Sequence, residues 1–292
     1  MEEIARRPSP KAVDGADPVV DTGHGTGNDG DGDFRGMKIL VVQSDDFGLC
    51  HSVNTGILRG FREGILTQST LMAPAPWFDE AVALAHEHDL PVGVHLTSNC
   101  DWDRYAWRPL TRAPSLVGPD GTFLRDPRET AARADRDEWR NEWLAQAQRV
   151  RDCGIEPTHL DAHMGPIPED LVAEVCRRTG LKSRRDLGEK NRDVMFPLVS
   201  RLSFGSQPME ERRARFRAWL EGLDDGWHFF CTHLAEPSDE LRSMCSPDWP
   251  SRVWTEDIRA MDLALVLDPE WPPLLRRLGI QLRSFRDLVA QG

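Results

Sequence analysis

The sequence predicts an α/β fold, a TIM-like, incomplete (β/α)7 barrel of parallel strands. Three observations support this prediction. Strand-like and helix-like segments alternate from Met37 to the end of the chain. The strand–helix units number nearer seven than eight. Polar side chains able to carry out chemistry follow four separate strands, and a parallel barrel builds its active site where its strands end.

Composition and charge exclude several classes of protein. The chain has 292 residues, of which 39% are hydrophobic and 29% charged, as expected of a globular protein. The net charge of −12 and the lack of a Lys/Arg block argue against nucleic acid or an anionic membrane as a partner. No apolar run approaches the length of about 18 residues that a membrane span needs.

We expect residues 1–36 to be a disordered leader and residues 37–292 to be one folded domain. The leader is rich in Gly and Asp and holds too little apolar surface to order itself. It lacks the apolar core of a secretory signal. The chain has six cysteines and no CxxC pair, which indicates reduced thiols in a cytoplasmic protein rather than a disulfide framework.

The first predicted strand, residues 39–42, leads into two adjacent acids, Asp45 and Asp46. A buried strand that ends in two acids is costly unless a partner neutralises one of them. A metal ion would do so, with Asp46 as a ligand and Asp45 beside it to handle protons. The alternative is that both acids solvate a loop or cap the next helix.

The next elements continue the alternation. Apolar residues at four-residue spacing from Val53 to Ile65 predict a helix, followed by a strand at 67–72 and a helix at 78–88. The segment after them predicts a strand with His95 near its end, on the face opposite the apolar residues. His95 is therefore either a metal ligand or a structural histidine with satisfied hydrogen bonds.

Residues 99–137 interrupt the alternation of strands and helices and have the length of a lid or binding loop. Their Trp and Tyr side chains suit either a sugar-binding face or packing within the loop. A helix follows at 139–150. In an extended segment after it, His159, Asp161 and His163 share one face, an arrangement that ordinary core packing does not explain.

The rest of the chain carries one more candidate residue. A helix is predicted at 168–179, residues 181–207 give no clear element, and a helix follows at about 209–223. The next strand ends near His233. The chain closes with helices at 251–267 and 271–278, a strand at 279–283 and a short helix from Phe285.

Taken together, the motifs resemble those of the YdjC-like carbohydrate deacetylases. The resemblance runs from about Met37 to Leu288, in order and in spacing, which makes it more specific than any single motif. The motifs are SDDFG at 44–48, VNTGI at 53–57, GILT at 64–67, STLM at 69–72, GVHL at 93–96, PTHLDAH at 157–163 and CTH at 231–233.

The resemblance implies a metal-dependent hydrolase that removes an acetyl group from a small N-acetylated sugar or glycoconjugate. Carried over by motif, Asp46, His95 and His163 would be the metal ligands, Asp45 the general base and His233 the general acid. Amide hydrolysis needs an activated water, a polarised carbonyl and a proton for the departing amine, and these residue types supply them. Two imidazoles favour zinc, with magnesium or another divalent ion as the alternative.

Several alternatives stay open. His159 could replace His163 as the third ligand, because both lie on one strand face. The chain also departs from the family pattern: Gln43 and Ser44 stand for Asn and Ala, Ala162 for Ser, and Leu234 for Pro. The acyl amide could therefore belong to a non-sugar compound, or the protein could bind metal and carbohydrate without turnover. A homodimer is compatible with the sequence, which does not determine the oligomeric state.

Two further matches carry little weight. The same ligand types serve non-haem iron oxygenases, but those use a close His-x-Asp pair on β-rich folds, whereas these residues follow distant strands. Asp46-Phe47-Gly48 is also a protein-kinase motif, yet no Gly-rich loop or kinase catalytic loop accompanies it.

Overall fold

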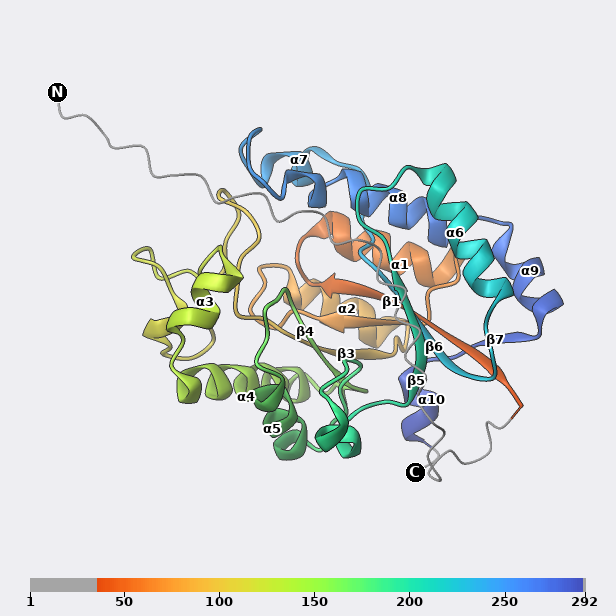
Figure 1. Cartoon of the computed structure of the whole chain (residues 1–292). Coiled ribbons are helices and arrows are strands. Elements are labelled where there is room, and N and C mark those ends of the chain that lie inside the picture. The colour runs from red at the N-terminus through yellow and green to blue at the C-terminus, as the bar shows by residue number, and fades with distance from the viewer. Residues whose placement is uncertain (1–35, 291–292) are drawn as a thin grey trace.

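Seven parallel strands form the central sheet of the computed structural model, which describes residues 36–290. The sheet order is β4-β3-β2-β1-β6-β5, with β7 paired to β1 (Figure 1). The strand β1 is therefore central, and it is also the longest. The bounds are β1 (Lys38–Phe47), β2 (Gln68–Leu71), β3 (Val92–Leu96), β4 (Leu160–Ala162), β5 (Leu198–Ser203), β6 (Gly226–Thr232) and β7 (Ile280–Leu282).

The sheet curves into a barrel that is not fully closed, as the sequence predicted. The edge strands β4 and β5 do not pair with each other. Instead, isolated bridges join Leu160 to Ser183 and Ser183 to Met195, just before β5 begins. At the other side, β7 pairs with the first three residues of β1, whereas β2 pairs with its later part, so β7 and β2 follow one another along the same strand.

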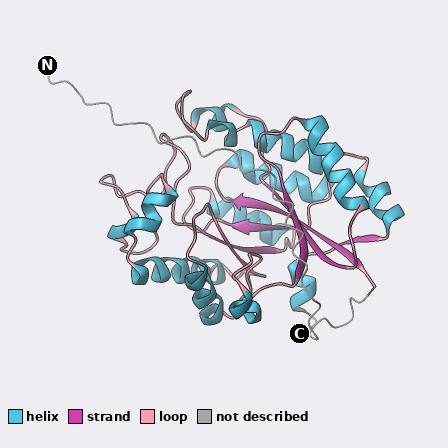
Figure 2. Cartoon of the chain, viewed as in Figure 1, coloured by secondary structure: helices cyan, strands magenta, loops and turns pink. Residues whose placement is uncertain are grey.

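Helices cover the outside of the sheet (Figure 2). In α1, for example, Val53 and Ile57 are fully buried, while Arg59 and Glu63 face solvent and pair with each other. This division follows from the four-residue apolar spacing. The helices are α1 (His51–Glu63), α2 (Phe78–Glu87), α3 (Pro127–Arg133), α4 (Arg136–Asp152), α5 (Glu169–Thr179), α6 (Met209–Glu221), α7 (Asp239–Ser243), α8 (Asp257–Val266), α9 (Trp271–Leu278) and α10 (Phe285–Val289).

Alternate residues of β1 belong to two different cores. Leu40 packs into the large cluster shared with the surrounding helices. Ile39 and Val41 instead pack with Trp227 and Phe229 of β6 in a separate cluster inside the barrel. This is the period-two alternation of a strand that is buried on both faces. The inner cluster fills the N-terminal end of the barrel with apolar side chains.

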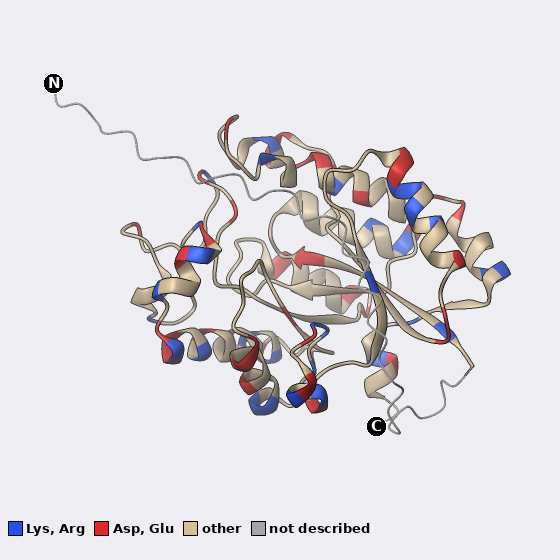
Figure 3. Cartoon of the chain, viewed as in Figure 1, with Lys and Arg blue, Asp and Glu red and all other residues tan. Residues whose placement is uncertain are grey.

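The same inward positions become polar toward the C-terminal ends of the strands. On β1 the inward series continues through Gln43 to Asp45, and on β6 it continues through Cys231 to His233. In Figure 3 acidic residues stand out at the arrowhead of β1, whereas most other charges lie on the outer helices. The barrel therefore has an apolar floor and a polar opening. The candidate residues predicted from the sequence lie at this opening.

Some predictions were incomplete or wrong. The strand β5 lies in the segment that gave no clear element, and the helix predicted over 251–267 is a 3-10 turn (Arg252–Trp254) followed by α8. The loop at 99–137 contains a 3-10 turn (Pro114–Leu116) and α3, and Trp102 and Trp107 are buried within it. Packing, not a sugar-binding face, explains these two tryptophans.

All six cysteines are free thiols. Across residues 36–290, the helices are too short or too polar for one of them to cross a bilayer. The expected leader, apart from Gly36, lies outside the described residues.

Candidate active site

The two acids at the end of β1 are brought to the same site by a break in the strand. Pairing with β2 shifts register between Ser44 and Phe47, and Asp46 has a φ of 73°. In a regular strand, adjacent side chains point to opposite faces. The left-handed residue at the bulge lets Asp45 and Asp46 serve one site from neighbouring positions. Non-glycine residues in this conformation store strain of about 1–3 kcal/mol and cluster at functional sites.

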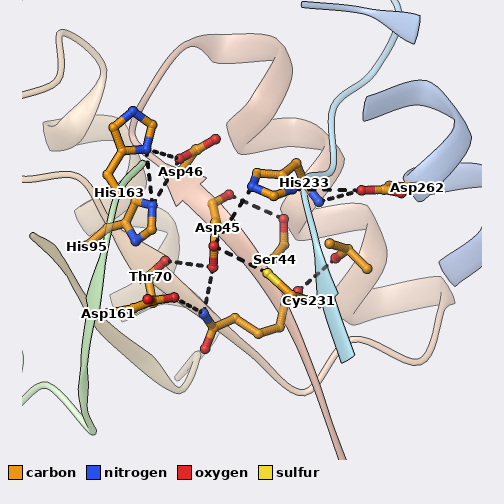
Figure 4. Close-up of polar contacts among 12 residues, drawn as sticks. Ser44, Asp45, Asp46, Thr70, His95, Asp161, His163, Cys231, His233 and Asp262 are labelled. Carbon is orange, nitrogen blue, oxygen red and sulfur yellow. Dashed lines mark hydrogen bonds and ion pairs between the residues drawn. The ribbon is translucent and has the colours of Figure 1, made fainter. Parts of the chain in front are cut away.

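Asp46, His95 and His163 converge at the C-terminal ends of β1, β3 and β4 (Figure 4). Asp46 Oδ1 lies 3.3 Å from His95 Nε2 and 3.3 Å from His163 Nδ1, and these two nitrogens are 3.3 Å apart. The three residues are only 1, 2 and 6% exposed. They form a nearly equilateral triangle of ligand-type atoms facing one point.

The triangle has the dimensions of a metal site. Ligand atoms about 2.0–2.1 Å from a tetrahedral ion are separated by about 3.3 Å, which is the spacing found here. Within the described chain, Asp46 Oδ1 has no hydrogen-bond partner although it is buried. A buried carboxylate oxygen without a partner is costly. These residues could therefore hold a divalent ion, and the donor set leaves positions open for water and substrate.

A second layer of charged residues holds the triangle in place. Arg259, from α8, donates to the other oxygen of Asp46 at 2.7 Å. Burial would raise the pKa of Asp46, but Arg259 and the rings of His163 and His95 hold it well below the usual range. Asp101 lies 2.9 Å from His163 Nε2. This contact fixes the tautomer that leaves Nδ1 facing Asp46.

The site attracts positive charge. Burial disfavours the protonated form of His163, yet Asp101 and Asp46 together raise its pKa to about 10. Without a metal ion, a proton on the His163 ring supplies positive charge between the Asp46 and Asp101 carboxylates. A divalent ion would displace that proton, since an imidazole must be deprotonated at the nitrogen that binds.

Asp45 has one anchored oxygen and one oxygen that faces the opening. Its Oδ1 accepts from Gln43 Nε2 at 2.6 Å and from Thr70 Oγ1 at 3.3 Å. Its Oδ2 lies 3.4 Å from Cys231 Sγ and 3.9 Å from His233 Nε2. Asp45 and His95 also present atoms within 4.8 Å of each other, which places this carboxylate beside the triangle.

His159 does not join the triangle. Its Nε2 lies 2.8 Å from Gln43 Oε1 and its Nδ1 2.8 Å from Thr158 Oγ1. Its ring packs edge-on against Phe285, and burial lowers its pKa to about 3. His159 is a neutral core histidine that supports Gln43, so the alternative in which it replaces His163 is wrong. The shared strand face is real, but the two rings stand at different depths of the barrel.

Asp161, between these histidines, also has a structural role. It accepts from Arg184 Nε at 2.5 Å and Arg185 Nε at 3.1 Å, and Gln43 donates to it at 2.9 Å. Burial raises its pKa, but the two arginines more than reverse that effect. Arg184 also reaches Asp45 Oδ2 at 3.5 Å. Asp161 thereby fixes Gln43 and Arg184, the two residues whose side chains contact Asp45.

His233 is the most exposed of the candidate residues, with 23% of its side chain accessible. Its Nε2 faces Asp45, and its Nδ1 is 4.0 Å from Asp262 Oδ2. Asp262 is fixed because it also accepts from the His233 backbone at 2.7 Å and pairs with Arg212. Trp254 packs edge-on against the His233 ring, at 5.2 Å between ring centres. An imidazole between two carboxylates can carry a proton to a substrate at the opening.

Two departures from the family pattern compensate each other. Leu234 stands where the resemblance leads us to expect Pro, and its additional backbone N–H is buried. Ser44 stands for Ala, and its Oγ accepts from that N–H at 3.0 Å. A buried donor without an acceptor would cost about 1–3 kcal/mol. The Ser44–Leu234 pair therefore preserves the local backbone without adding chemistry to the site.

The charged residues that support the triangle and His233 were not predicted from the sequence. Arg259 and Asp262 lie three positions apart on the inner face of α8, where they interrupt an apolar helix. Two charged residues on the buried face of an apolar helix are the sequence signal that could have identified Arg259 and Asp262. Asp101 lies in the long loop, where nothing in the sequence distinguishes it from neighbouring acids.

The chain matches the family model described as YdjC-like protein over residues 39–277. A carbohydrate deacetylase from Geobacillus stearothermophilus is 40% identical over 264 residues, covering 86% of this chain and 98% of the relative. A chitooligosaccharide deacetylase from Yersinia pestis (strain Pestoides F) is 28% identical over 275 residues, covering 86% of this chain and 99% of the relative.

One solved structure supports the fold. It is a proposed cellobiose-phosphate cleavage protein from Enterococcus faecalis V583, with a TM-score of 0.69 and 21% identity, covering 86% of this chain and 99% of that one. Because the family model spans most of the described residues and the Geobacillus relative is similar over nearly its whole length, this chain belongs to the YdjC-like protein family.

Proposed function

We propose that the protein is a metal-dependent hydrolase that removes an acetyl group from an N-acetylated sugar or glycoconjugate. The carbohydrate and chitooligosaccharide deacetylases among its relatives support the substrate class. The observation that carries the proposal is the triangle of Asp46, His95 and His163, in which one corner is a buried Asp46 oxygen that accepts no hydrogen bond. A carboxylate and two imidazoles at this spacing suit hydrolysis by an activated water.

We assign Asp46, His95 and His163 as the metal ligands. Two imidazoles favour zinc, and magnesium or another divalent ion is the alternative. When bound, such an ion supplies Lewis-acid polarisation of the amide carbonyl and lowers the pKa of a water. Arg259 and Asp101 keep the three ligand atoms oriented before the ion arrives.

Asp45 and His233 move the protons in this proposal. Asp45 Oδ2 accepts the proton of the attacking water, because Oδ1 is already occupied by Gln43 and Thr70. His233 Nε2 donates a proton to the departing amine, and Asp262 lies behind the ring, 4.0 Å from Nδ1. Asp45 Oδ2 and His233 Nε2 are 3.9 Å apart, so both groups can reach one amide that binds at the opening next to them.

Acetate release is the direct test of this function. Metal-free protein, resupplied separately with Zn²⁺, Mg²⁺, Mn²⁺, Co²⁺ or Ni²⁺, is incubated with a panel of N-acetylated sugars and glycoconjugates. We expect acetate in amounts equal to the free amine formed, and only with metal. Acetate release from non-sugar amides alone would show that the substrate is not a sugar. Metal binding without any acetate release would indicate a binding protein.

Replacing Asp45 by Asn tests the general base. The amide keeps the size of the side chain but cannot accept the proton, so we expect turnover to fall about 10²–10⁴-fold. Metal content should remain at one ion per chain, because Asp45 is not one of the ligands. Undiminished turnover of Asp45→Asn with the metal bound would remove this residue from the mechanism.

Replacing Asp101 by Asn tests the support of His163. The amide cannot hold the ring with a charge, and we expect metal affinity to fall about 10–100-fold. Competition with a chelator measures this affinity without any substrate. Asp120→Asn is the matched control, since Asp120 lies in the same loop and bonds only within it. Equal affinities in the two variants would contradict the proposed contact.

A further inference from the structure

A second set of metal-competent atoms lies next to the first. Asp45, Cys231 and His233 present a carboxylate oxygen, a thiol sulfur and an imidazole nitrogen, all within 4.8 Å of one another. They come from the ends of β1 and β6, and none of them belongs to the triangle (Figure 4). Cys231 has no part in the proposed reaction. The proposed reaction therefore does not explain why this thiol lies 3.4 Å from Asp45 Oδ2.

The distances suit zinc. Zn–S and Zn–O bonds of about 2.3 and 2.0 Å at a tetrahedral ion place sulfur and oxygen about 3.5 Å apart. Asp45 Oδ2 and Cys231 Sγ are 3.4 Å apart. His233 Nε2 is 3.9 Å from the same oxygen, slightly wider than a bound ion requires, but its ring is the most accessible of the three and stands at the opening.

The charges around this set leave room for a cation. Arg184 is the nearest positive group, and its closest contact is to Asp161 at 2.5 Å. It is farther from Asp45 Oδ2, at 3.5 Å, and from Cys231 Sγ, at 3.9 Å. Asp262 lies behind the His233 ring and is itself paired with Arg212. Asp161 binds Arg184 more closely than Asp45 does, while also pairing with Arg185. Asp45 remains the carboxylate nearest the thiol and the His233 ring.

We propose that Asp45, Cys231 and His233 form a second, weaker zinc site whose occupancy blocks catalysis. Zinc binds the carboxylate and imidazole lone pairs, and a zinc–sulfur bond replaces the sulfur–hydrogen bond as the thiol proton leaves to solvent. The binding site stands on geometry alone. The inhibition rests on the proposed function, because a zinc ion there occupies both the general base and the general acid.

The second site is weaker than the triangle because its atoms are less well placed. In the triangle the three ligand atoms are all 3.3 Å apart and buried. In the second set His233 Nε2 is 3.9 Å from Asp45 Oδ2, and its side chain is 23% exposed. The triangle is therefore expected to fill with the first equivalent of metal, and the Cys231 site only with an excess.

Cobalt titration tests the site without any substrate. Co²⁺ is added to metal-free protein, and the near-ultraviolet charge-transfer band of a cobalt–thiolate bond is recorded. We expect no such band with the first equivalent, because the triangle contains no sulfur, and a band with the second. Cys231→Ser should lose the band while still binding the first equivalent, which also shows that it is folded.

Two controls keep the cobalt experiment decisive. Cys153→Ser should keep the band, since Cys153 follows α4 and is not one of the three proposed ligands. X-ray absorption of the unmodified protein with two equivalents of zinc needs no variant, and we expect one sulfur neighbour for every two zinc ions. A second equivalent that binds without sulfur, or a band that survives Cys231→Ser, would overturn the proposed site.

Zinc inhibition tests the consequence separately. In the unmodified protein, zinc beyond one equivalent should suppress acetate release, and Cys231→Ser should raise the half-inhibitory zinc concentration at least about tenfold, as loss of a supporting group already does at metal sites. If no substrate is turned over, the proposed function fails and the cobalt result still decides the site. If cobalt reports the thiolate but excess zinc leaves turnover unchanged, the inhibitory role is wrong.

Discussion

The burial of the Asp46 carboxylate is the constraint on which the site depends. This side chain is 1% exposed, at a left-handed residue near the end of the central strand, with one oxygen paired to Arg259 and the other accepting no hydrogen bond. An ionised carboxylate in such a place is unfavourable unless positive charge surrounds it. His95 and His163 approach the unpaired oxygen, and Asp101 and Arg259 hold the arrangement from behind. The atom that most needs a nearby positive charge is therefore the one that would bind the metal ion in the proposed function.

Two neighbouring carboxylates acquire different roles through their partners. Asp46 is held by a buried arginine and faces two imidazoles, so its oxygen suits a metal ion. Asp45 is held through one oxygen by Gln43 and Thr70, and its other oxygen faces Cys231 and His233 at the opening. The break in β1 makes this division possible, since a regular strand would place one of the two acids outside the barrel.

The sequence predicted the fold and the convergence of the candidate residues because both depend on local patterns. Apolar runs ending in Asp45, His95 or His233 mark strands, and parallel strands bring their ends to one rim. The pattern could not separate His159 from His163, because strand alternation defines a face but not a depth along it. It also missed β5, a polar edge strand in which Ser200 takes one of the buried positions. Arg259, Asp101 and Asp262 come from a helix and a loop far away in the chain, and only the folded structure brings them to the site.

The most direct test of the account is the anomalous diffraction of crystals grown with one equivalent of zinc. We expect a single strong peak about 2.0–2.1 Å from Asp46 Oδ1, His95 Nε2 and His163 Nδ1. Arg259 should remain on the other oxygen of Asp46. A single peak elsewhere in the barrel, for example between Asp45 and Asp161 with the triangle empty, would contradict the central claim that Asp46, His95 and His163 form the metal centre.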